Sequence, residues 1–99
     1  MNITEKINNL DVELVVSGRV DTNTAPQLEA KIKDYMKKCL ELVVDMSDVE
    51  YISSAGLRVI LAGHKMAGKE KRFILKKPSA FCMQVLEATG MAPLLNIKN

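Results

Sequence analysis

Hydrophobic and polar residues alternate along the first part of the chain, which predicts strands at its start. Residues 3–7 predict a weak strand, and Asn8 and Asn9 favour a turn. In residues 10–17 every second residue is apolar, and the residues between them are polar except for Val15. This pattern predicts a hairpin with one covered face, whose second strand ends at Gly18. The face that we expect to be covered carries Leu10, Val12, Leu14 and Val16.

Three later segments have the three-and-four spacing of amphipathic helices. Thr24 to Gln27 matches a capping box with Pro26 in the first turn, which predicts that a helix begins there. A second helix is expected from about Ser54 to Met66, and a third is expected after the cap Ser79. The inward-facing residues that we expect on these three helices are Leu28, Ile32, Tyr35, Met36 and Cys39, then Leu57, Ile60, Leu61 and His64, then Cys82, Val85, Leu86 and Thr89.

The remaining apolar runs predict three further strands. Residues 42–44 are continuously apolar, which is typical of a central parallel strand covered on both faces, and Asp45 is expected to close it. Residues 71–76 and 94–97 predict the other two strands. The resulting order predicts an α/β fold: a mixed β-sheet with an N-terminal hairpin, later parallel strands and about three main helices. At 99 residues, we expect a single domain spanning residues 1–99.

The composition of the chain excludes several classes of function. With 14 basic and 12 acidic residues the net charge is +2, too small to indicate direct nucleic-acid binding. Basic residues gather locally, and they form either a solvated face or a surface for an anionic partner. They are Lys65, Lys69, Lys71, Arg72, Lys76 and Lys77. No secretory signal and no apolar run of roughly 18 residues is present, so we expect a cytoplasmic chain without membrane insertion.

Candidate chemistry centres on Ser53 and Ser54, which follow a strand and open a helix. Free backbone N–H groups and the positive end of the helix dipole meet there, a favourable place for a phosphate. A serine hydrolase is the enzymatic alternative, but Ile52 replaces a glycine that a nucleophile elbow requires, and only Gly56 fits. The single histidine, His64, lies about 15 Å further along the same helix, too far to act as a base. We therefore expect no enzyme and no catalytic residue.

Neither a metal nor a cofactor is expected. Asp21, Asp45 and Asp48 are the candidate metal ligands, but their positions in the sequence favour loop solvation and capping instead. Cys39 and Cys82 each fall among apolar residues without metal or redox spacing, so we expect them to behave as small hydrophobic side chains.

Two segments of the chain resemble a known family. Asp45 to Leu61, with its Asp-x-Ser start and Tyr-Ile-Ser-Ser-Ala-Gly-Leu-Arg core, resembles the signature of the sulphate-transporter and anti-sigma-factor-antagonist (STAS) domain. Ser17 to Ala25 is similar to a second family segment, in which Gly-x-x-Asp precedes a Thr-Ala helix start. The length and the order of elements also agree over essentially the whole chain.

The resemblance implies a small bacterial anti-anti-sigma factor, or anti-sigma factor antagonist. Such a protein binds an anti-sigma factor serine kinase and releases a sigma factor. The kinase switches it off by phosphorylating the serine that opens the helix, and a phosphatase restores it. Matching the motif places this phosphoacceptor at Ser54. Where the family often has an acidic residue before the acceptor, this chain has Ser53, so both hydroxyls stay candidates.

We expect the partner to bind where the loop from Arg19 to Thr24 meets the turn from Ser53 to Arg58, at one edge of the sheet. The expected contact residues are Arg19, Asp21, Thr22, Asn23, Thr24, Ser53, Ser54, Ala55, Gly56, Leu57 and Arg58. Asp21 is needed by no apolar stripe or cap, so we expect it to serve binding rather than stability. The alternative function is a soluble STAS accessory subunit of a membrane transport system, which binds the cytoplasmic ATPase of that system.

Overall fold

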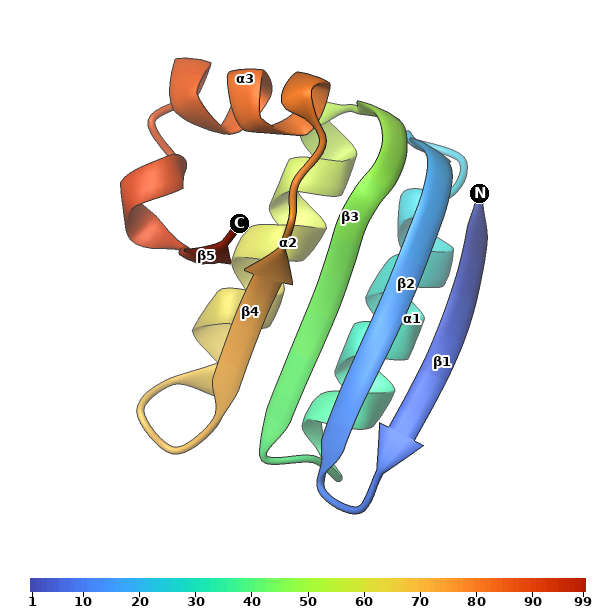
Figure 1. Cartoon of the computed structure of the whole chain (residues 1–99), viewed down its shortest axis with the longest axis vertical. Coiled ribbons are helices and arrows are strands. Elements are labelled where there is room, and N and C mark those ends of the chain that lie inside the picture. Colours follow the sequence, from blue (N-terminus) through green and yellow to red (C-terminus); the bar gives the residue numbers. More distant parts are fainter.

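The five strands lie in the sheet in the same order as in the sequence (Figure 1). The computed structural model describes residues 1–99. β1 and β2 are antiparallel, and every other neighbouring pair is parallel. The predicted fold class, a mixed α/β sheet with an N-terminal hairpin and three helices, is therefore confirmed. The elements are β1 (Asn2–Asn8), β2 (Asp11–Val20), α1 (Ala25–Met36), β3 (Glu41–Ile52), α2 (Ser54–Ala67), β4 (Arg72–Lys76), α3 (Ala80–Ala88), the 3-10 helix η1 (Ala92–Leu94) and β5 (Asn96–Lys98).

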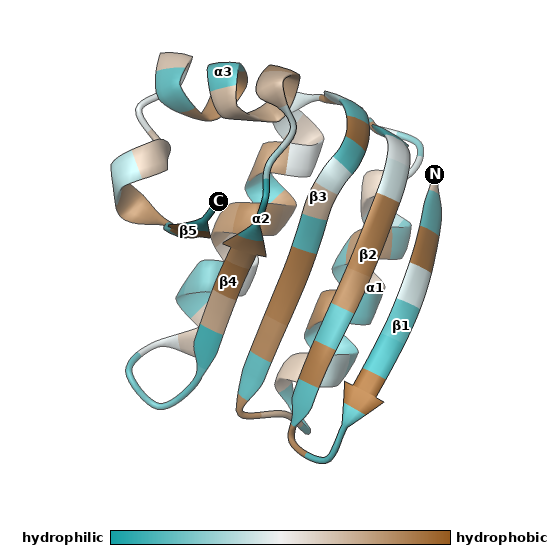
Figure 2. Cartoon of the chain, in the orientation of Figure 1, coloured by the Kyte–Doolittle hydropathy of each residue, from teal (hydrophilic) through white to brown (hydrophobic).

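The core lies between one face of the sheet and the helices α1 and α2, which lie side by side behind it (Figure 1). Hydrophobic residues are concentrated along β2, β3 and β4, while β1 at the edge is mostly polar (Figure 2). Leu14, Val44 and Leu75 occupy neighbouring strands in one row of the sheet and are almost completely buried. α3 packs against the far end of β3.

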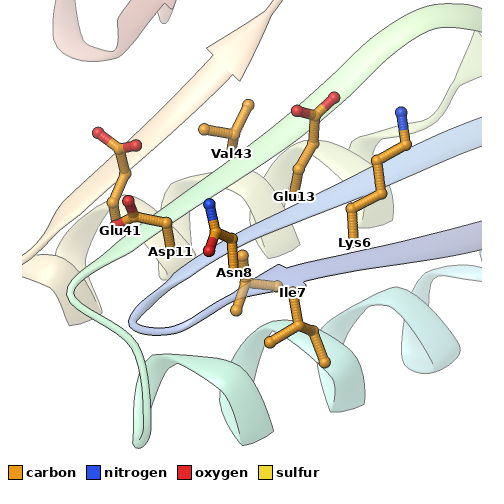
Figure 3. Close-up of a pocket in the computed structure, with 8 residues that line it drawn as sticks. Lys6, Ile7, Asn8, Asp11, Glu13, Glu41 and Val43 are labelled. Carbon is orange, nitrogen blue, oxygen red and sulfur yellow. The ribbon is translucent and has the colours of Figure 1, made fainter.

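The opposite face of the sheet is open, which corrects the expectation that the central strand is covered on both sides. Val43 is only half-buried, and Figure 3 shows Lys6, Glu13 and Val43 projecting from the face away from the helices. Glu13 reaches Lys76 across this face at 3.3 Å. Parallel pairing was predicted correctly, but a run of three apolar residues does not reveal whether a second layer of helices exists.

β2 and β3 are longer than predicted. β3 continues past Asp45 to Ile52, and β2 continues past Gly18 to Val20. The register shifts twice between the two strands, between Val15 and Ser17 and between Gly18 and Arg19. Bulges of this kind interrupt strict alternation, so the period of two ends before the strands do. Leu10 was also placed wrongly: it lies in the turn and is exposed.

The helix positions agree with the prediction, whereas some inward faces differ. α1 begins at Ala25, α2 begins at Ser54, and the Ser79 hydroxyl caps α3 by accepting a 3.2 Å bond from the Cys82 N–H. Four expected inward residues are less buried than predicted: Tyr35, Leu61 and Val85 are half-buried and Thr89 is exposed. His64 is half-buried, which agrees with a place at the edge of its stripe. Cys39 and Cys82 are buried free thiols, as expected, and burial raises the pKa of both. None of the helices has the length and apolar character needed to span a bilayer.

Candidate functional site

The carboxyl ends of β2 and β3 bring the two predicted binding segments together. Arg19 lies opposite Tyr51 in the parallel ladder, and Val20 lies opposite Ile52. The Ser53 N–H then donates a 2.9 Å hydrogen bond to the Val20 carbonyl, just before α2 begins. The loop from Arg19 to Thr24 and the turn from Ser53 to Arg58 therefore share one edge of the sheet, as the sequence predicted.

Gly56 allows the start of α2 to approach the end of β2 closely. A Cβ at this position would lie 2.7 Å from Cγ1 of Ile52, 2.9 Å from Cγ1 of Val20 and 3.1 Å from the Val20 carbonyl oxygen. These distances are too short for any side chain to fit without displacing the strand end. Gly56 is thus a packing residue that sets where Ser53 and Ser54 lie.

The two adjacent serines have different structural roles. Ser53 has extended backbone angles and is the N-cap of α2, where its side chain accepts a 3.4 Å hydrogen bond from the Gly56 N–H. Its carbonyl accepts a further bond of 3.0 Å from the Leu57 N–H. Ser54 is the first residue of the helix, and it is exposed. The cap uses the hydroxyl of Ser53 and leaves that of Ser54 facing solvent at the positive end of the helix.

Asp21 holds its own loop together, which corrects the expectation that no cap needs it. Its Oδ1 accepts hydrogen bonds from the backbone N–H groups of Asn23 and Thr24, at 3.0 and 3.1 Å, and lies 3.2 Å from the hydroxyl oxygen of Thr24. Arg19 lies 3.8 Å from the other carboxylate oxygen. These bonds, above all the one from the Thr24 N–H, lower the pKa of Asp21. The carboxylate therefore shapes the loop that precedes α1.

Thr24 does not form the predicted capping box. Its hydroxyl donates to the Arg19 carbonyl at 2.8 Å and accepts from the Asp21 N–H at 2.9 Å, so it closes the loop instead of capping α1. The side chain of Thr24 makes no cap bond to the helix. The motif therefore predicted where the helix starts, but a partner within the loop takes the hydroxyl.

A shallow groove runs between the first turns of α1 and α2. Thr22, Ala25, Pro26 and Glu29 line one side, and Ala55, Arg58 and Val59 line the other. Among the expected contact residues, Arg19, Thr22, Asn23, Ser54 and Arg58 are exposed. Leu57 is 7% exposed and belongs to the core, and Gly56 is also buried. The accessible chemistry of these exposed residues is therefore hydroxyl, carboxamide and guanidinium groups.

Two aromatic residues at the same edge were missed as site residues. The Arg19 guanidinium lies over the Tyr51 ring, 4.3 Å from its centroid, and the Tyr51 ring lies 5.6 Å from that of Phe81. Tyr51 stands inside the quoted motif, but nothing near Phe81 in the sequence indicates this contact. By contrast, the three aspartates Asp21, Asp45 and Asp48 do not gather into a cluster able to hold a metal ion.

The match to a protein-family model decides the family. Residues 3–96 match the family described as "Mlab, STAS domain". The chain belongs to the STAS domain family. The resemblance seen in the two sequence segments therefore extends over nearly the whole chain.

Known STAS proteins similar to this chain are named as regulatory factors. The anti-sigma-B factor antagonist of Listeria monocytogenes is 29% identical over 104 residues, which cover 100% of this chain and 91% of that protein. The crystal structure of an anti-sigma factor antagonist from Mycobacterium paratuberculosis is 26% identical and has a TM-score of 0.88, covering 98% of this chain and 84% of that chain. These names describe regulatory binding proteins rather than enzymes.

A third structure shares the fold at lower identity. The phosphorylated form of the Bacillus cell fate determinant SpoIIAA has a TM-score of 0.77 at 18% identity, and the match covers 99% of this chain and 92% of that chain. At this identity the likeness shows the fold alone.

Proposed function

We propose that this STAS protein is a cytoplasmic anti-sigma factor antagonist that binds an anti-sigma factor serine kinase and so releases a sigma factor. Phosphorylation of Ser54 by the kinase switches the antagonist off, and a phosphatase restores it. The observation that carries this proposal is the division of roles between the two serines: Ser53 caps α2, and Ser54 is exposed beside it. The names of similar proteins support the same function.

The position of Ser54 suits a switch that leaves the fold intact. A phosphate adds about 1.5 to 2 negative charges, and the start of a helix stabilises negative charge. A partner surface that fits the bare hydroxyl meets this dianion with repulsion or a desolvation cost. A penalty of about 1.4 kcal/mol already weakens binding tenfold. Modification of Ser54 therefore lowers affinity for the kinase while the STAS domain stays folded.

The test is phosphorylation by the serine kinase that the chain captures from its native cells. We expect incubation with that kinase and ATP to add one phosphate, which peptide mapping places on Ser54. The Ser54→Ala variant binds the kinase but is not modified, whereas Ser54→Asp binds weakly. Ser53→Ala is the matched control and is still modified at Ser54.

Three results would contradict the proposal. The first is phosphate on Ser53 or Ser47 with Ser54 unmodified, which removes Ser54 as the acceptor. The second is equal affinity of Ser54→Ala and Ser54→Asp for the kinase, which removes the charge-operated interface. The third is capture of a transport ATPase in place of a kinase, which supports the accessory-subunit function instead.

A further inference from the structure

An aromatic and cationic cluster lies next to the proposed phosphoacceptor and has no role in that switch. It joins three elements: Arg19 from β2, Tyr51 from β3 and Phe81 from the first turn of α3. The guanidinium lies 4.3 Å from the Tyr51 ring centroid, and the two aromatic rings are tilted by 36° at a centroid separation of 5.6 Å. The three side chains form one continuous row.

The row remains accessible although its members contact one another. Phe81 is 40% exposed, which makes it one of the few large hydrophobic side chains outside the core, and Tyr51 is half-buried. The Arg19 side chain is 58% exposed even with Asp21 beside it. Core packing therefore leaves part of the Phe81 ring and more than half of the Arg19 side chain in contact with water.

Contacts within the row hold these side chains in place before any partner arrives. Arginine over a tyrosine face is attracted by the ring quadrupole, and tilted aromatic pairs are favourable. Side chains that are already ordered lose little entropy on binding, and aromatic residues and arginine are enriched among the residues that dominate protein interfaces. The row thus has the residue types and the pre-ordered side chains that are typical of the centre of a protein interface.

We propose that Arg19, Tyr51 and Phe81 form an anchoring surface for the anti-sigma factor, outside the phosphoacceptor itself. This inference rests on the proposed function. The surface is continuous with the edge that carries Ser54, because Tyr51 lies two residues before the cap Ser53 and Arg19 begins the adjoining loop. This surface is complementary to two neighbouring side chains of the kinase. An apolar side chain would pack on Phe81, and a carboxylate beside it would pair with the Arg19 guanidinium.

Titration calorimetry with the captured kinase tests the anchor. We expect Phe81→Ala to weaken binding at least tenfold, and we expect Arg19→Gln to weaken it as well. Leu94→Ala is the matched control, since Leu94 is 57% exposed but lies in η1, and its affinity should equal that of the wild type. In phosphorylation assays Phe81→Ala should raise KM and leave kcat unchanged, because Ser54 is intact. Melting temperatures check that each variant folds.

The outcomes separate this inference from the function on which it rests. If the wild type binds the kinase and the affinity of Phe81→Ala is within twofold of the wild-type affinity, the proposed anchoring surface is wrong and the proposed function stands. An equal loss in Leu94→Ala, or a loss of kcat in place of a rise in KM, also overturns the anchor. If the unmodified wild type binds no anti-sigma factor kinase, the proposed function and the anchor both fail.

Discussion

The Ser53 N–H donates a 2.9 Å hydrogen bond to the Val20 carbonyl, and this bond joins the end of β3 to the end of β2. The next residue, Ser54, opens α2, and the residue after Val20 is the loop-bracing Asp21. One backbone contact therefore fixes the position of the exposed serine relative to the loop. The proposed switch therefore lies beside a backbone hydrogen bond between two strand ends, and a change of charge at Ser54 can reach a partner without refolding the domain.

The division of roles between the serines predicts different effects on stability. Ser53→Ala removes the N-cap and should lower the free energy of unfolding by about 0.5–2 kcal/mol, near the lower end because the cap bond is long at 3.4 Å. Ser54→Ala should change it by no more than about 0.5 kcal/mol, as exposed substitutions usually do. Urea denaturation of the two variants measures the difference. Equal losses would contradict the assignment of the cap to Ser53.

Gly56→Ala tests the close approach between α2 and the end of β2. The added Cβ would lie 2.7 Å from a side-chain atom of Ile52 and 3.1 Å from the backbone oxygen of Val20, and a backbone atom cannot rotate away. Overpacking of this kind should lower the free energy of unfolding by about 1–3 kcal/mol. Chemical denaturation measures the loss, with Ser54→Ala as the control in the same turn. A variant as stable as the wild type would show that the edge is loosely packed.

The sequence predicted elements whose signals are local and missed features that depend on distant contacts. The cap Ser79 and the order of helices and strands along the chain follow from neighbouring residues, and the structure confirms them. The motif also predicted the edge at which Ser54 lies. The contact between Tyr51 and Phe81 joins residues thirty positions apart, so no local pattern reports it.

Two further errors arose because one sequence pattern serves more than one geometry. Thr24 precedes a helix as a capping residue does, but a hydrogen-bond partner inside the loop takes its hydroxyl. A short apolar run such as residues 42–44 is compatible with one covered face or two. Hydrogen bonds within the loop decide the role of Thr24, and the placement of the helices on the sheet decides which faces of residues 42–44 are covered.

Replacing Asp21 should affect stability and binding together. Asp21→Ala removes the acceptor of two backbone hydrogen bonds and leaves the N–H groups of Asn23 and Thr24 without their partner. We expect the melting temperature to fall by about 4–8 °C, the shift that the loss of one net hydrogen bond produces in a domain of this size. Affinity for the kinase should also fall, because the loop that adjoins Ser53 loosens. Thr22→Ala, at an exposed loop position, is the control, and its melting temperature should equal that of the wild type.

The charge of Asp21 should appear in the pH dependence of stability. Hydrogen bonds, chiefly from the Thr24 N–H, lower its pKa in the folded chain below the ordinary value of 3.8. A carboxyl whose folded pKa is lowered contributes stability above the unfolded pKa, and this contribution disappears as the pH falls through the folded pKa.

Asp21→Asn isolates this effect because the amide keeps an acceptor oxygen but has no charge. At neutral pH the variant should be less stable than the wild type, since its bonds to the two N–H groups lack the assistance of a charge. As the pH falls below the ordinary value of 3.8 and through the lowered pKa of the folded chain, the wild-type carboxyl takes up a proton, and the two proteins should converge in stability. Denaturation at a series of pH values from neutral to acidic measures the gap between them. If the difference in the free energy of unfolding between the two proteins stays constant across the series, the charge of Asp21 does not stabilise the loop. The side chain would then act only through the size and position of its acceptor oxygen.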